Sequence, residues 1–114
     1  MKSKRFVAVA LAWTAVLHTV VGIFLYRGQL ADMARDGLFN SVDSGGRSSA
    51  FWFFLFGAMI WTLSRVVGWL ANNGQRVPLF LGAHLLAVGL IGVFFAPLSG
   101  FWLVIPQAIV LLRR

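Results

Sequence analysis

The 114-residue sequence predicts an all-α fold: a four-transmembrane-helix bundle with a short interfacial helix in the first loop. Hydrophobic residues make up 60% of the chain, charged residues make up 11%, and the mean hydropathy is +0.85. A soluble domain carries about 25% charged residues, and a small one has little interior in which to bury apolar side chains. We therefore expect one membrane domain, residues 1–114, with the lipid bilayer as its main surroundings.

The first predicted helix covers residues 6–26 and contains no charged residue. Its length of roughly 30 Å is enough to cross the hydrocarbon core. The basic start followed by an apolar run resembles a signal peptide, but the run is longer than a signal peptide needs, which favours an uncleaved helix. Small and polar residues recur at every fourth position and share one face, turned towards other helices: Thr14, His18, Gly22 and Tyr26.

Residues 27–48 form the only long polar interruption, and they contain all three acids of the chain, Asp32, Asp36 and Asp43. Leu30, Met33 and Ala34 recur at helical spacing, opposite polar residues, which predicts a short amphipathic helix on the membrane surface. Gly37 suits the position that ends this helix.

The other predicted helices cover residues 50–71, 79–96 and 101–112. Ser48 or Ser49 is expected to cap the first of these three. In the next helix, Gly82, Gly89 and Gly92 would allow close helix packing, either within the chain or between copies in a homo-oligomer.

Positive charge predicts the topology of the chain. Six of the ten basic residues lie at the ends of apolar segments on the side of the two termini: Lys2, Lys4, Arg5, Arg76, Arg113 and Arg114. This bias places both termini in the cytoplasm and loop 27–48 outside. Because no basic face is interleaved with aromatic residues, we expect no nucleic-acid partner.

The last predicted helix is too short to cross the membrane, because its 12 residues span only about 18 Å. Its preceding turn at Ser99 should therefore lie at membrane depth, where its backbone needs cover. We predict that loop 27–48 acts as a lid over an outer-facing pocket. His18, Ser99 and Trp102 would line this pocket, and Phe39 and Asn40 would close it.

A second, inner polar layer is predicted from the depth of Arg65, His84 and Gln107, counted from the cytoplasmic helix ends. The two histidines differ in depth by roughly 10 Å, which disfavours bis-histidine haem. We expect no cofactor, no metal site and no catalytic residues, since no acid lies inside the apolar segments and no cysteine is present.

Three stretches carry a resemblance that covers nearly the whole chain: residues 18–22 (HTVVG), 35–40 (RDGLFN) and 97–102 (PLSGFW). On these stretches the chain resembles a family of small bacterial membrane proteins catalogued as a domain of unknown function. That resemblance implies a four-helix inner-membrane protein and brings no activity and no catalytic residues. The size is also similar to small multidrug resistance transporters, but the glutamate that they carry in the first helix is absent here.

Three functional hypotheses follow from the sequence. The first is a membrane protein that binds a small apolar or amphipathic molecule, or a lipid, in the outer pocket. The second is a structural or accessory subunit that acts through helix packing, and the third is a small transporter or channel. An enzyme is disfavoured, because no nucleophile, base and acid follow one another in the sequence.

Overall fold

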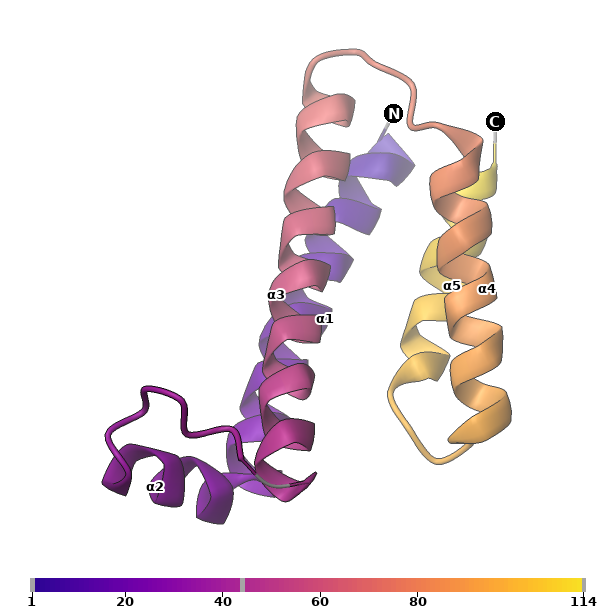
Figure 1. Cartoon of the computed structure of the whole chain (residues 1–114). Helices are drawn as coiled ribbons and strands as arrows, with labels where there is room; N and C mark the ends of the chain where they lie inside the picture. Colours follow the sequence, from indigo (N-terminus) through magenta and orange to yellow (C-terminus); the bar gives the residue numbers. More distant parts are fainter. Residues whose placement is uncertain (1, 44, 114) are drawn as a thin grey trace.

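The computed structural model describes residues 2–43 and 45–113, and within these residues it contains five helices and no strand (Figure 1). The all-α prediction is confirmed. Two helices, α1 and α3, are long and apolar enough to cross a membrane, whereas α4 and α5 are shorter apolar helices. The helix bounds are α1 Lys2–Leu25, α2 Arg27–Arg35, α3 Gly45–Asn72, α4 Leu79–Phe95 and α5 Phe101–Leu112.

Helices α1 and α3 form one antiparallel pair, and small residues on α3 let the two backbones approach closely (Figure 1). A Cβ atom added at Gly57 would lie 3.0 Å from Cδ2 of His18. Further along the pair, the Ser64 hydroxyl donates a hydrogen bond of 2.9 Å to the carbonyl of Ala8. This bond satisfies a buried hydroxyl and fixes the register of the two helices.

Helices α4 and α5 form a second antiparallel pair, which is packed through the glycines of α4. Gly82, Gly89 and Gly92 are all buried, and a Cβ atom added at any of them would meet α5 residues at 3.0 Å or less. The predicted role of these glycines in close packing is therefore met within the chain. The glycine face is already covered by α5.

The two pairs join at the end where α1 begins and α5 ends. Leu11, Val67, Val77 and Leu111 are buried there in one apolar cluster. The ammonium group of Lys4 donates hydrogen bonds to the carbonyls of Val110 at 2.5 Å and Arg113 at 2.8 Å. Since the last carbonyls of a helix have no partner within it, this lysine also caps α5.

Two helix starts differ from the sequence prediction. Helix α1 begins at Lys2 and not at residue 6, and α3 begins at Gly45 and not at residue 50. The prediction that Ser48 or Ser49 caps α3 is therefore wrong: the Ser49 hydroxyl donates back to the carbonyl of Gly45 at 3.0 Å, inside the helix. The predicted interfacial helix is present as α2, and the chain leaves it at Gly37 with a φ of 84°.

Candidate functional site

A cleft of about 560 Å³ separates the two helix pairs at the end opposite to the termini. Helices α1 and α3 form one wall of the cleft. The other wall consists of the turn at residues 98–100 and the first half of α5. Most lining residues are apolar, and the polar ones are Thr14, His18 and Ser99. The full lining is Thr14, Leu17, His18, Val21, Leu25, Phe53, Phe56, Ile60, Leu98, Ser99, Gly100, Phe101, Leu103 and Val104.

His18 lies on α1, and its side chain is held against α3 at the wall of this cleft. Its Nε2 atom lies 2.7 Å from the carbonyl oxygen of Phe53, and its ring stacks on the Phe53 ring with centroids 3.8 Å apart. Because a carbonyl only accepts, Nε2 must carry the proton, which leaves Nδ1 as an acceptor in the neutral ring. His18 therefore ties two helices together and also lines the cleft.

The other two polar groups of the cleft, the hydroxyls of Ser99 and Thr14, are hydrogen-bonded within the chain. The Ser99 hydroxyl donates to the carbonyl of Ala96 at 2.6 Å and accepts from the amide of Phe101 at 3.4 Å, which shapes the turn before α5. The Thr14 hydroxyl donates to the carbonyl of Ala10 at 2.8 Å and accepts from Gln107 at 3.0 Å. With these hydroxyls engaged, the cleft presents a mainly apolar surface.

Trp102 does not line the cleft. Its indole nitrogen donates to the carbonyl of Pro97 at 2.8 Å, and the residue is exposed. Phe39 and Asn40, predicted to close the pocket, also lie outside the lining, and Phe39 is 94% exposed. The structure thus brings together His18 and Ser99 but neither Trp102 nor the two loop residues.

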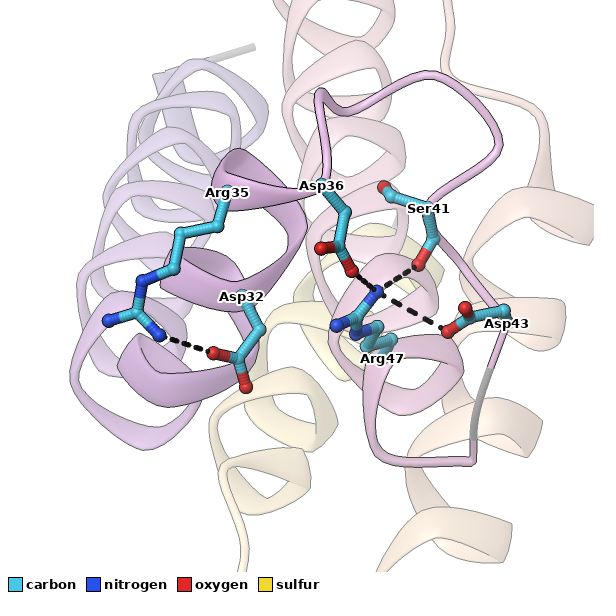
Figure 2. Close-up of polar contacts among 6 residues, drawn as sticks. All are labelled: Asp32, Arg35, Asp36, Ser41, Asp43 and Arg47. Atoms are coloured by element: carbon cyan, nitrogen blue, oxygen red, sulfur yellow. Dashed lines mark hydrogen bonds and ion pairs between the residues drawn. The ribbon is translucent and has the colours of Figure 1, made fainter.

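The loop is held elsewhere by Arg47, in the first turn of α3 (Figure 2). One nitrogen of Arg47, Nη1, lies 2.7 Å from the Asp36 carboxylate and 3.3 Å from that of Asp43. The same nitrogen donates to the carbonyl of Ser41 at 3.0 Å. These three contacts fold residues 36–43 back onto the start of α3.

Among the described residues, none from loop 27–48 lines the cleft. Helix α2 projects from the α1/α3 pair on the side away from α4 and α5 (Figure 1). The predicted lid therefore does not lie over the cleft, because Arg47 draws the carboxylates of Asp36 and Asp43 to α3. Asp32 is paired within α2, at 2.9 Å from Arg35, so each acid of the loop has an arginine partner.

The predicted inner polar layer is not assembled. Arg65 lies on α3 and lines a separate groove with α1, whereas His84 is exposed on α4 beside Phe80. In the described residues, the α4 backbone does not come close to the backbone of α1 or α3, so Arg65 and His84 lie on separate helix pairs. Gln107 instead bonds Thr14 across the α1–α5 contact, and its buried Oε1 has no partner among the described residues.

Sequence reasoning missed the apolar residues that form most of the cleft. Three of them, Leu17, Val21 and Leu25, lie on α1 in the same stripe as Thr14 and His18. Their spacing of three and four residues places them on one helix face. The sequence contains this spacing, but the polar and small residues at every fourth position predicted a narrower helix face.

Together, the fold and the cleft define an apolar all-α protein built from two antiparallel helix pairs that enclose a cleft at one end. The model of a family of unknown function, DUF6463, matches residues 2–114. The chain belongs to this family, which confirms the resemblance to a domain of unknown function. No curated protein and no solved structure matches the chain.

Proposed function

We propose that this protein spans the bacterial inner membrane and binds a small apolar or amphipathic molecule, or a lipid chain, in the cleft between its helix pairs. The observation that carries the proposal is the cleft itself, about 560 Å³ in volume and lined almost entirely by apolar side chains. Ligand sites are commonly clefts of about 300–1,000 Å³ with few polar groups.

The exposed surface supports a membrane location. Only 28% of the most apolar window of α1, and 28% of that of α3, is buried, whereas a core helix of a soluble protein is mostly buried. Phe24, Trp13 and Met59 are each more than 60% exposed. Exposed apolar side chains in this number are stable in lipid and costly in water.

The cleft chemistry favours a ligand with a long apolar part. The hydroxyls of Thr14 and Ser99 are already hydrogen-bonded within the chain, so they impose little cost on apolar contact. The remaining acceptor, Nδ1 of His18, can receive one hydrogen bond from a hydroxyl or amide of the ligand. An acyl chain carrying one such donor fits this arrangement.

Native mass spectrometry of the detergent-purified protein tests the proposal by detecting a co-purified or added ligand. The variant Val21→Phe places a phenyl ring in the cleft, and Val88→Phe is its control, because both valines are 41% exposed but Val88 does not line the cleft. We expect the bound ligand to be lost in Val21→Phe and kept in Val88→Phe. Equal occupancy of wild type and Val21→Phe would rule out the cleft as the binding site.

The proposed topology is testable because the chain contains no cysteine. Single cysteines at Phe39→Cys and Gln75→Cys report on the loop and on the join between α3 and α4, which are both exposed. With both termini cytoplasmic, a membrane-impermeant maleimide added to intact cells should label Phe39→Cys and not Gln75→Cys. Labelling of Gln75→Cys alone would reverse the topology, labelling of both would show that the chain inserts in two orientations, and labelling of neither would contradict a loop outside the cytoplasm.

A further inference from the structure

A second groove, of about 490 Å³, runs between α1 and α3 near the chain termini. It lies at the opposite end of the molecule from the cleft and shares no lining residue with it. Its lining combines two arginines, two asparagines and several small residues: Arg5, Ala8, Val9, Ala12, Ser64, Arg65, Gly68, Trp69, Asn72 and Asn73.

Small side chains form the apolar part of this groove. Gly68 faces Ala8 closely, since an added Cβ atom at Gly68 would lie 3.5 Å from the Ala8 Cβ. The Ser64 hydroxyl is turned into the helix pair by its bond to the Ala8 carbonyl. With this hydroxyl engaged, the part of the groove between Ala8 and Ala12 offers an apolar surface next to the arginines.

The charges of the groove are unbalanced. Arg5 and Arg65 both line it, and every Asp of the chain lies between residues 32 and 43, while Glu is absent. The three acids are paired with Arg35 and Arg47 at the other end of the molecule. Two arginines that line one groove without a carboxylate favour an anion from outside the chain.

The neutral residues indicate which kind of anion fits. Asn72 and Asn73 line the groove at the end of α3. One N–H of the Asn73 amide donates to the carbonyl of Trp69 at 2.8 Å, and the Trp69 side chain is 62% exposed beside them. Arginine and amide donors match the oxygens of a phosphate, and an exposed tryptophan is typical of the headgroup level of a bilayer. Val9, which is 56% exposed, continues the apolar wall away from the arginines.

We propose that this groove binds the phosphate of an anionic phospholipid, with Arg5 and Arg65 on the phosphate and the Ala8–Ala12 face of α1 against an acyl chain. This inference rests on the proposed membrane location and not on the cleft ligand. A soluble phosphate has the same charge, but it leaves the apolar wall of the groove uncovered. The lipid therefore uses more of the groove than the free ion does.

Binding is measured by native mass spectrometry in a non-ionic detergent, with phosphatidylglycerol, phosphatidylcholine or inorganic phosphate as the probe. The double variant Arg5→Gln/Arg65→Gln should bind phosphatidylglycerol about tenfold or more weakly than wild type. Its matched control is Arg76→Gln/Arg113→Gln, which removes two charges at the same end but outside the groove. In the control, the loss of phosphatidylglycerol affinity should be less than about half of the loss in Arg5→Gln/Arg65→Gln. Phosphatidylcholine binding should be weak in all variants.

Equal loss in the two double variants would show that only the general positive charge matters, and it would overturn the site. Displacement of phosphatidylglycerol by an equal concentration of inorganic phosphate would assign the groove to a soluble anion and would overturn the lipid. The Val21→Phe variant should bind phosphatidylglycerol like wild type, because Val21 lines the cleft and not the groove. A failure of the cleft proposal can therefore be distinguished from a failure of the groove proposal. The cysteine-labelling experiment separates both from a failure of membrane insertion.

Discussion

At the loop end of the molecule, every acid of the chain is paired with an arginine, whereas the terminus end contains no acid. Loop 27–48 holds three arginines and three aspartates, so 3 − 3 gives a net charge of zero. The other 10 − 3 = 7 basic residues account for the whole net charge of +7. The positive and negative charges of the loop therefore balance within the chain. The excess positive charge near the termini is balanced only by counterions from outside.

Packing differs between the two ends as well. At the terminus end, the helix pairs join through a buried apolar cluster that includes Leu11 and Leu111. At the loop end, the pairs separate around the cleft, and α5 is held mainly against α4. One end thus combines a packed core with unbalanced charge, and the other combines balanced charge with an open apolar cleft.

The largest effect is expected from filling the closest helix contact at the loop end. In Gly92→Ala, the new Cβ atom would overlap the Cγ atom of the Phe101 ring, so the ring or the α5 backbone must move. We expect a loss of about 1–3 kcal/mol in the free energy of unfolding, measured by denaturant titration in detergent.

The control for this change is Gly68→Ala at the terminus end, where the added Cβ atom would make an ordinary contact at 3.5 Å. Because alanine favours a helix over glycine, this variant should be unchanged or stabilised by about 0.5–1 kcal/mol. Equal destabilisation in both variants would show that the two ends are packed equally tightly.

The next effect concerns the charge balance of the loop. In Arg47→Ala, the contacts to Asp36, Asp43 and the Ser41 carbonyl are all lost. Amide hydrogen exchange at Ser41, whose amide donates to the Leu38 carbonyl at 3.1 Å, should then accelerate on the order of tenfold. The cleft and the helix pairs should keep their exchange rates.

Arg35→Ala is the control for Arg47→Ala, because it removes the same charge from the loop but breaks one ion pair, to Asp32, where Arg47→Ala breaks two. The side chains of Arg35 and Asp32 are 75% and 51% exposed, and such exposed pairs contribute little to stability. Exchange at Ser41 should therefore stay close to wild type. A similar acceleration in both variants would mean that net charge, and not the Arg47 contacts, orders the loop.

The smallest expected effect comes from backbone strain in the same loop. Leu38 has a φ of 67°, in the left-handed region that costs a leucine roughly 1–2 kcal/mol. Leu38→Gly removes this strain, although glycine also gains freedom in the unfolded chain. Protection of the Ser41 amide should rise by about two- to fivefold. Asn40→Gly, at a φ of 51° that asparagine tolerates, should change less.

A decrease of protection in Leu38→Gly would show that the exposed leucine side chain stabilises the loop by contacts with lipid or detergent. That outcome would give the loop end a dependence on lipid of the kind that we propose for the groove at the terminus end.

The sequence by itself determined the helices and the family of this protein. Long apolar runs specify helices α1 and α3, and the amphipathic spacing of Leu30 and Met33 specifies α2. The glycines of α4 indicated close packing, which follows from the absence of a side chain. The sequence also showed that all acidic residues lie in loop 27–48 and that most basic residues lie outside it.

Only the tertiary structure decided which faces meet. The sequence could not show that the α4 backbone lies against α5 and away from α1 and α3, and so it placed Arg65 and His84 in one layer that the fold does not form. It also could not show that Arg47 gathers Asp36 and Asp43 and so turns the loop away from the cleft. Depth along a helix follows from residue number, but the direction in which a side chain points depends on how the helices rotate and tilt against one another.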